Sequence, residues 1–411
     1  MKTSNVKRFA LAGASGRALG MFAHPIATRL RDSAQVVGVF DINAVRAAFV
    51  ANACGAPPTY SDFDLMLRET RPDCVIVTTV DRYHHQYIIA ALEAGCDAIT
   101  EKPMTIDDEK CRAILAAEKR TGRKVTVTFN YRFQPYVTRV KEIIRHGAIG
   151  QPLSVDFQWI LDTRHGADYF RRWHRRMENS GGLFVHKATH HFDMVNWWLD
   201  DEPESVYALG ALRFYGPTRD ARGERCSTCP HKATCEFYVD FAADPVLKAL
   251  YFDAEHLDGY YRDRCVFADE IDIYDTMSAT VRYCSGAQLS YSLIAHSPYE
   301  GWRATINGAG GRLELEEFHS GHRVAEPNMV VRLYNRRGEV VSYDIMKAKG
   351  GHGGGDTRLQ DRLFSGREYP DPLGYMAGSR AGAVSILIGV AANRSVITGQ
   401  PVKIADLLRE T

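Results

Sequence analysis

The chain has 411 residues, of which 45% are hydrophobic and 25% are charged, as is ordinary for a globular protein. Its formal net charge of +1 lacks the positive excess that is typical of proteins that bind nucleic acid or an anionic membrane surface. The first residues run into a strand without an apolar signal segment, and no apolar run approaches the length of a membrane span, so we expect a cytoplasmic enzyme of two or three domains.

A glycine-rich turn follows the first predicted strand, residues 8–12. It is a variant of the GxGxxG/A fingerprint, in which Gly13 makes the tight turn while small Ser15 and Gly16 let the backbone approach a pyrophosphate. We include Arg17, the next residue, among the predicted cofactor-binding residues. Ser15 replaces the usual second glycine, so an ordinary strand-to-helix turn is the alternative.

Asp41 ends the second predicted strand, residues 36–41, 28 residues after Gly13. A carboxylate near this offset accepts hydrogen bonds from the adenosine ribose hydroxyls and repels a 2′-phosphate. The position therefore predicts NAD rather than NADP as the cofactor. The alternative is an acid that caps the following helix.

Strands and helices continue to alternate up to residue 131, which predicts a parallel sheet and a Rossmann dinucleotide-binding domain over residues 1–131. The predicted strands are residues 74–79, 97–100 and 125–129, and the predicted helices are residues 83–94 and 107–120. Thr79, His84 and Asn130 lie at or just after strand ends, where ligands bind in such sheets, and we count them as cofactor-binding residues.

Lys102 stands in the stretch Thr100-Glu101-Lys102-Pro103, directly after a predicted strand. Pro103 cannot extend a ladder, so the chain must turn there, at the ligand-binding edge of the sheet. A partly desolvated lysine has a lowered pKa and can act as a general acid or base. With Glu101, it is also a candidate cofactor contact. The alternative is a surface lysine before a turn.

The second part of the chain, residues 132–411, has a different pattern. After a helix at residues 136–146 come longer alternating strands, which predict a C-terminal α/β domain with a large, mostly antiparallel open sheet. These strands are residues 153–160, 278–293 and 311–315, and a last helix covers residues 379–399. Residues 216–269 interrupt the pattern as a cysteine-rich insertion.

The segment from Gly181 to Asp193 carries the densest candidate chemistry. His186 and His190 are four residues apart on one helix face, and Asp193 is placed to orient a ring. The HxxxH spacing also suits zinc, but a metalloprotease needs Glu at the second position, where Lys187 would repel a cation.

Together with the glycine-rich turn, Ala91-Leu92-Glu93-Ala94-Gly95 and Glu101-Lys102-Pro103, this segment resembles the glucose–fructose oxidoreductase/inositol dehydrogenase (Gfo/Idh/MocA) family. The resemblance implies oxidation or reduction of a carbinol on a sugar, inositol or related polyol with NAD(P), and a homo-oligomer, dimer or tetramer, that assembles through the open sheet. Lys102 matches the family's catalytic lysine, His190 the histidine of its GGxxxDxGxHxxD pattern and Asp193 the final acid. His84 aligns with a family histidine near the cofactor.

Two departures from that pattern bear on the chemistry. His186 stands where the family usually has Asp, so the usual carboxylate near the substrate hydroxyl is missing. Lys187, the next residue, adds a second cation. The predicted catalytic residues are therefore Lys102, His190, His186 and Asp193. The substrate, or even the reaction, can differ from that of a sugar dehydrogenase.

Four further cations are candidates for substrate binding. Arg132 follows the last Rossmann strand, Lys187 adjoins His186, and Arg164 and His165 open a stretch rich in donors and aromatics. Such side chains can hold hydroxyls or a carboxylate. The alternative for residues 164–176 is a solvated loop.

Cys226, Cys229, Cys235 and Cys265 form a separate motif that begins with CxxC. Four thiolates suit tetrahedral zinc or an iron–sulfur cluster. We favour zinc, since nicotinamide already supplies redox chemistry; cysteines without metal are the alternative.

Three functions are open from the sequence. The first is an NAD-dependent oxidoreductase acting on a saccharide or polyol. The second is an NAD-dependent glycoside-cleaving enzyme that works by transient oxidation and elimination, and the third is a non-catalytic sugar-sensing protein.

Overall fold

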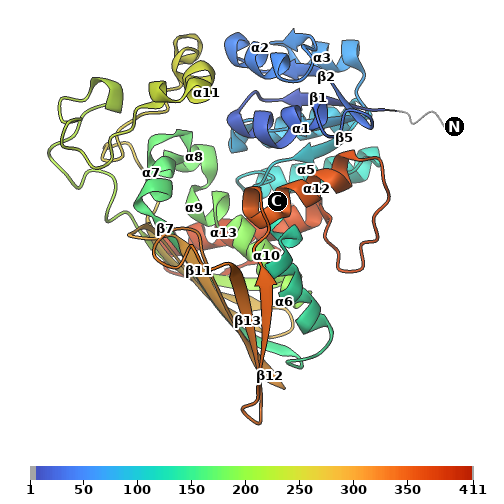
Figure 1. Ribbon diagram of the computed structural model, residues 1–411, viewed down its shortest axis with the longest axis vertical. Coiled ribbons are helices and arrows are strands. Elements are labelled where there is room, and N and C mark those ends of the chain that lie inside the picture. The colour runs from blue at the N-terminus through green and yellow to red at the C-terminus, as the bar shows by residue number, and fades with distance from the viewer. Residues whose placement is uncertain (1–5, 410–411) are drawn as a thin grey trace.

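The computed structural model describes residues 6–409, which contain two sheets and the helices that pack on them (Figure 1). The first sheet has the order β15-β6-β5-β4-β1-β2-β3. Its first six strands in sequence are parallel, and β15 adds antiparallel to β6. The strands are β1 (Lys7–Ala12), β2 (Ala34–Phe40), β3 (Thr59–Tyr60), β4 (Cys74–Val77), β5 (Asp97–Thr100), β6 (Val125–Val127) and β15 (Ala377–Gly378).

This sheet is a Rossmann sheet, as predicted, with a buried centre. All four residues of β4 are buried, because helices cover both faces of a parallel sheet. The helices are η1 (Ala18–Ala23), α1 (His24–Ala27), α2 (Ala44–Asn52), α3 (Phe63–Thr70), η2 (Asp81–Tyr83), α4 (His84–Glu93), α5 (Asp108–Thr121) and η3 (Asn130–Phe133). Side chains of Asn43, Asp62 and Asp107 cap α2, α3 and α5 by accepting from a backbone N–H three residues on.

The second sheet has nine strands in the order β14-β13-β12-β11-β7-β10-β9-β8-β16 and is antiparallel except between β10 and β7. The strands are β7 (Pro152–Asp162), β8 (Pro203–Ala211), β9 (Thr276–Tyr283), β10 (Gln288–Ser297), β11 (Gly301–Gly308), β12 (Gly311–Phe318), β13 (Asn328–Asn335), β14 (Val340–Met346) and β16 (Val402–Lys403). The prediction of one strand at residues 278–293 was wrong, because Gly286, with φ of 91°, turns the chain into the hairpin β9–β10.

Helices of the second domain pack between this sheet and the Rossmann domain (Figure 1). They are α6 (Pro135–Arg145), α7 (Thr163–Arg171), η4 (Trp173–Arg175), α8 (Met177–Ser180), α9 (Gly182–His186), α10 (Thr189–Leu199), η9 (Gly351–Gly354), α12 (Gly355–Phe364), α13 (Ser379–Thr398) and α14 (Ile404–Leu408). The C-terminal part of the chain returns to the first domain, since β15 joins its sheet and α12 packs on η1 and η3.

Helix α13 corrects one expectation from the sequence. By length and composition it is long and apolar enough to cross a membrane, whereas we expected no such run. Of its apolar window, 67% is buried inside the protein, where α13 packs on β8, α9 and α10. We therefore conclude that α13 is a core helix of the protein.

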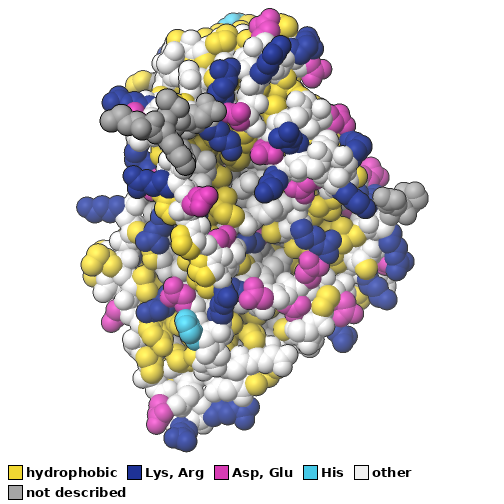
Figure 2. Space-filling view, turned by 90° about the vertical axis from the view of Figure 1, so that its right-hand side faces the viewer, with side chains coloured by type: hydrophobic (Ala, Val, Ile, Leu, Met, Phe, Trp, Pro, Cys, Tyr) yellow, Lys and Arg dark blue, Asp and Glu magenta, His cyan; other side chains and the backbone are white. Residues whose placement is uncertain are grey.

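The insertion occupies residues 212–275, between β8 and β9, and is built from short turns of helix. They are η5 (Cys226–Thr228), η6 (Phe241–Ala243), α11 (Pro245–Leu247), η7 (Lys248–Phe252) and η8 (Glu255–Leu257). An isolated bridge joins Arg225 to Arg264. The part around α11 and η7 packs against α2 of the Rossmann domain (Figure 1). Charges of both signs are interspersed over the face in Figure 2.

Candidate active site

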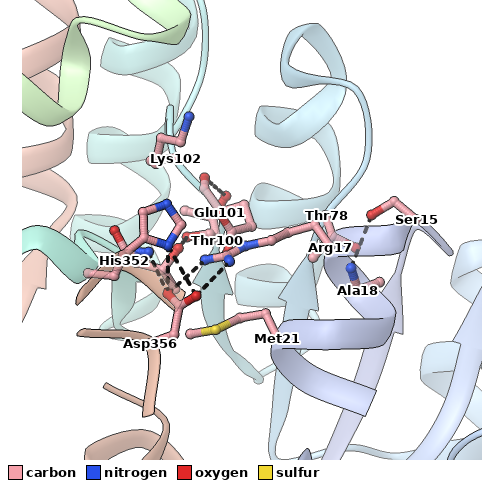
Figure 3. Close-up of polar contacts among 12 residues, drawn as sticks. Ser15, Arg17, Ala18, Met21, Thr78, Thr100, Glu101, Lys102, His352 and Asp356 are labelled. Atoms are coloured by element: carbon pink, nitrogen blue, oxygen red, sulfur yellow. Dashed lines mark hydrogen bonds and ion pairs between the residues drawn. The ribbon is translucent and has the colours of Figure 1, made fainter. Parts of the chain in front are cut away.

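The glycine-rich turn has the shape that a dinucleotide requires. Gly13 has φ of 102°, and a Cβ there would lie 2.8 Å from backbone atoms of Thr78 and Thr79, so only glycine fits. The Ser15 hydroxyl accepts a hydrogen bond from the Ala18 N–H at 3.1 Å (Figure 3). The Gly16 N–H donates to the Tyr251 hydroxyl at 2.8 Å. The tight turn at Gly13 and the small side chains that follow it fit a pyrophosphate.

Asp41 follows β2 and lies beside this turn. Its carboxylate accepts from the N–H groups of Ala14 (2.7 Å) and Asn43 (2.8 Å) and lies 3.6 Å from the Arg46 guanidinium. Burial raises the pKa of Asp41, although Arg46 and the two N–H groups oppose that shift. Asn43, and not Asp41, caps helix α2, so the alternative role of Asp41 as a helix cap is excluded.

Arg17, Glu101 and Asn130 are brought together by a residue that we did not anticipate, Asp356 of α12. Arg17 donates to Glu101 at 2.9 Å and to Asp356 at 3.2 Å (Figure 3). The Asn130 amide also donates to Asp356, at 2.6 Å, and His352 lies 3.1 Å from it. Burial opposes ionisation, but His352 and Arg17 hold the pKa of Asp356 well below its usual range. The C-terminal part of the chain therefore completes the cofactor side of the site.

His84 is buried at the start of α4 and joins two loops of the sheet edge. One ring nitrogen lies 2.9 Å from the Pro103 carbonyl oxygen and the other 3.0 Å from that of Thr79. It is not a helix-surface histidine. Through these contacts it fixes the turn that carries Lys102 relative to the end of β4.

Lys102 lies just after the carboxyl end of β5, and its amine points away from the contacts of Arg17, Glu101 and Asp356 (Figure 3). Its Nζ donates to the His186 carbonyl oxygen at 3.2 Å. Burial lowers the pKa of Lys102 to about 8, against the opposing charges of Asp81 and Glu101. This is the poised amine that general acid–base chemistry needs, and not a solvated surface lysine.

A carboxylate missed in the sequence stands next to the substituted family position. Asp81, in η2 after β4, has a carboxylate oxygen 2.5 Å from Nδ1 of His186. Burial raises the pKa of Asp81, against the charge of Lys102, and burial together with that lysine lowers the pKa of His186. In the sequence, Asp81 could have been noticed only as an acid shortly after a strand of the Rossmann sheet. The buried ring of His174 packs on His186, with centroids 4.1 Å apart.

His190 is 3% exposed and packs edge-to-face on Tyr131, with ring centroids 4.9 Å apart. Within residues 6–409 its Nδ1 has no hydrogen-bond partner. Burial and the nearby charge of Lys102 lower the pKa of His190 well below its usual value, so the ring is neutral. The ring is thus neutral, with one buried nitrogen left without a hydrogen bond inside the described part of the protein.

Two predicted roles beside His190 were wrong. Both carboxylate oxygens of Asp193 accept from Arg132, at 2.8 and 2.5 Å, so Asp193 does not orient the His190 ring. Arg132 also donates to the Gly374 carbonyl at 2.8 Å and is thereby engaged away from a substrate. The pair is a buried structural link between η3 and α10.

The predicted substrate residues divide into two groups. Lys187 is buried with its Nζ 4.6 Å from the Trp159 ring centre, and burial lowers its pKa to about 8 although Glu300 opposes this. His165 lies 3.0 Å from Glu300, so Lys187 and His165 share one carboxylate neighbour. Arg164 is exposed at the start of α7 and lies outside this group. Residues 163–171 are helical, not a solvated loop.

The predicted metal ligands meet without forming a single-ion site. Nowhere between residues 6 and 409 are three or more His, Cys, Asp or Glu side chains placed to hold one metal ion. The zinc alternative for His186 and His190 therefore gains no support, and His186 is paired with Asp81. Cys226, Cys229, Cys235 and Cys265 do line one common hollow in the insertion.

A Rossmann sheet whose glycine turn fits a pyrophosphate, with a lysine of lowered pKa at the same edge, defines an NAD-dependent oxidoreductase. Residues 7–129 match the family model described as oxidoreductase family, NAD-binding Rossmann fold. Residues 141–404 match the C-terminal alpha/beta domain of the same family. The chain belongs to the Gfo/Idh/MocA oxidoreductase family, and the predicted family and fold class are confirmed.

Known proteins agree with this assignment. The chain is 40% identical to YteT of Bacillus subtilis (strain 168), which is named as an oxidoreductase, over 98% of this chain and 99% of that protein. It is 32% identical to the D-apiose dehydrogenase of Paraburkholderia graminis over 44% of this chain and 49% of that enzyme. A levoglucosan dehydrogenase structure with NADH and levoglucosan shares the fold, with a TM-score of 0.69 at 19% identity over 97% of this chain and 99% of that one.

Proposed function

We propose that the protein oxidises or reduces a CH–OH group of a sugar, an inositol or a related polyol. The observation that carries the proposal is the Lys102 amine, held beside neutral His190 at the cofactor edge with a pKa of about 8. Relatives named as inositol 2-dehydrogenases and a D-apiose dehydrogenase support the substrate class.

In this mechanism NAD, when bound, supplies hydride chemistry at its nicotinamide. Neutral Lys102 takes the hydroxyl proton during oxidation, and protonated Lys102 returns it during reduction. His190, a neutral ring near the lysine charge, would assist at the same hydroxyl. The Asp81–His186 pair lies next to the lysine, whose Nζ donates to the His186 carbonyl oxygen.

The remaining hydroxyls of the substrate need donors and acceptors on the side of the second domain. Lys187 and His165 reach that side, and both lie near Glu300. A lysine with a pKa of about 8 is still largely charged at neutral pH, so this side also suits an acidic sugar. Arg164 and Arg132 have no role in this arrangement.

A second candidate is glycoside cleavage by transient oxidation, favoured by one observation. The Asp81–His186 pair is a second proton-handling group within reach of Lys102, whose Nζ contacts the His186 carbonyl. Oxidation of a ring hydroxyl to a ketone acidifies the neighbouring C–H. The pair would take that proton, the C–H electrons would form a double bond to the anomeric carbon, and the aglycone would leave with its bonding electrons and take up a proton. Water would then add across the double bond, and the hydride together with a proton would return to the ketone.

A panel of sugars, inositols, uronates and glycosides separates the candidates. Each is incubated with the protein and NAD, NADH is followed by absorbance, and products are identified by mass spectrometry. NADH formed in equal amount to an oxidised product supports the dehydrogenase. Release of an aglycone without net NADH supports the second candidate, and binding without turnover contradicts both in favour of a sugar-sensing protein.

We further propose a cytoplasmic homo-oligomer that assembles through the open face of the second sheet. Tyr207 and Leu209 of β8 point out from that face, and Leu209 is 61% exposed. Light scattering after size exclusion tests the assembly. A monomer at micromolar concentration would contradict it, and Leu209→Glu should weaken the assembly.

A further inference from the structure

Lys141 and Lys187 are both buried, but they differ in what holds their ammonium groups. Lys141 is 1% exposed, donates to the Trp197 carbonyl oxygen and pairs with Asp200. Lys187 is 6% exposed and lies over the Trp159 ring, and no hydrogen bond or ion pair joins its Nζ to any residue from 6 to 409. A buried cation without a paired acceptor is costly, so a ligand is expected to supply the acceptor.

The Lys187 ammonium lies on the side of the proposed reaction site. Lys187 directly follows His186, whose carbonyl oxygen accepts from Lys102. Burial lowers the pKa of Lys187 to about 8, and the charge of Lys102 adds to this against Glu300, so Lys187 is still largely charged at neutral pH. In turn, the charge of Lys187 contributes, after burial and Lys102, to lowering the pKa of His190. Lys187 is therefore within electrostatic reach of both residues proposed to handle the hydroxyl.

Glu300, the carboxylate whose charge opposes the lowered pKa of Lys187, is engaged by other groups. Both of its carboxylate oxygens lie 3.0 Å from Nδ1 of His165, and Nδ1 of His319 lies 3.7 Å from one of them. Burial opposes ionisation, but these two imidazoles hold the pKa of Glu300 well below its usual range. Glu300 thus attracts Lys187 from a distance without forming an ion pair with it.

His319 is a second cation on this side, and it already has its partners. Burial opposes its charge, but the carboxylates of Glu300 and Glu317 raise the pKa of His319 to about 9. Glu317 lies 3.4 Å from Nε2 of His319 and also accepts from the Trp302 indole at 2.7 Å. The two carboxylates are therefore bound to other donors, and Lys187 is left as the cation without a direct partner.

We propose that Lys187 binds the carboxylate of the substrate, so that the substrate is a sugar acid, such as a uronate, and not a neutral sugar or an inositol. This inference rests on the proposed function, because the carboxylate is a second group on the molecule whose CH–OH reacts at Lys102. An ammonium–carboxylate pair shielded from water is stronger than a hydrogen bond from the ammonium to a neutral hydroxyl. It also compensates a charge that burial disfavours.

The test compares sugars that differ only in the acid group, which are galacturonate with galactose, glucuronate with glucose, and the methyl glycosides of all four. Each is titrated calorimetrically into the full chain with NADH present, because NADH cannot accept a hydride and the affinity is then measured without turnover. We expect at least one acid to bind about 10- to 100-fold more tightly than its neutral partner. Equal affinities in every pair, or no binding of any acid, would overturn the proposal.

Two variants assign the preference to Lys187. Lys187→Met removes the charge but keeps a chain of similar length over Trp159, so the acid should lose most of its advantage over the neutral sugar. Lys187→Arg keeps the charge and should retain part of that advantage, and Arg164→Ala, which changes an exposed cation outside the group, should retain all of it. A folded Lys187→Met chain with the full preference would overturn the proposal. If this variant does not fold, the sugar pairs in the unaltered protein still decide.

Turnover separates this inference from the proposed function. A sugar acid that binds through Lys187 and yields neither NADH nor a changed product would contradict the oxidoreductase and support the carboxylate site. A neutral polyol that is oxidised with NADH formation, at least as efficiently as every acid, would support the oxidoreductase and overturn the role of Lys187.

Discussion

The edge of the Rossmann sheet and the cysteine-bearing insertion both gather polar side chains from distant parts of the chain, but different forces hold them. At the edge, Lys102, Asp81 and His84 follow strands or begin helices whose backbones are already hydrogen-bonded, and burial shifts their pKa values. In the insertion, the cysteines stand on short turns around a partly open hollow. The edge is built on hydrogen-bonded strands and helix starts, whereas the insertion is held by side-chain contacts, such as the ion pairs of Arg225 with Glu255 and Asp263.

If this comparison holds, variants at the edge should lower the rate of the chemical step, and variants in the insertion should change cofactor affinity. The largest expected effect is that of Lys102→Ala, which removes the proton-handling amine. Its single-turnover rate should fall by about 10²–10⁴ with NAD affinity nearly unchanged. Lys141→Ala is a matched control, because that lysine is also buried with a lowered pKa but donates to the Trp197 carbonyl oxygen, outside the site. An equal loss in both variants would contradict a special role for Lys102.

His190→Ala should lose about 10²-fold or more in the same assay, because it removes the neutral ring that faces the reacting hydroxyl. The double variant with Lys102→Ala should lose less than the product of the two single losses, since the pair acts as one unit. Asp193→Asn should instead lower the melting temperature with a smaller effect on rate, as its carboxylate holds Arg132. Fully multiplicative losses would show that the two residues act independently.

The cofactor side gives a smaller effect. NAD should bind about tenfold more tightly than NADP or better, because the buried Asp41 carboxylate would face a phosphate in the latter. In Asp41→Ser the difference in affinity between NAD and NADP, measured by fluorescence titration, should be smaller. Asp62→Asn, which alters a helix cap away from the turn, should leave it unchanged. Equal affinities in the unaltered protein would remove Asp41 from the adenosine site.

The smallest effect is expected from the insertion. Asp258→Asn should raise the Kd for NAD by about three- to tenfold, because the segment that contacts Gly16 and Asn43 loses its ion pair with Arg46. The rate at saturating NAD should not change, and Cys284→Ser should leave both quantities alone. A loss of rate at saturating NAD would mean that the insertion takes part in the chemistry, and the comparison would fail.

The sequence predicts the parts of the site that depend on neighbouring residues, and it misses the parts that depend on contacts between distant residues. The glycine turn, Lys102 and His190 were identified because each lies in a short motif beside a strand or helix. Asp81 was missed because its partner His186 is 105 residues away, and His352 and Asp356 because a glycine-rich stretch far along the chain carries them to Arg17. Asp193 was misassigned because helical spacing pointed to His190, whereas the bidentate contact goes to Arg132, 61 residues earlier.

The central claim is that Lys102 handles the proton of the reacting hydroxyl, and the pH dependence of single-turnover oxidation tests it most directly. Burial lowers the pKa of this lysine to about 8, so the amine is charged below that pH and neutral above it. As a base it must be neutral, so the oxidation rate should rise with pH through about 8 and then level off, while the reverse reduction should fall over the same range. In Lys102→Ala this rise should disappear. An unchanged rise in Lys102→Ala, or an oxidation rate that falls through pH 8 in the unaltered protein, would contradict the account.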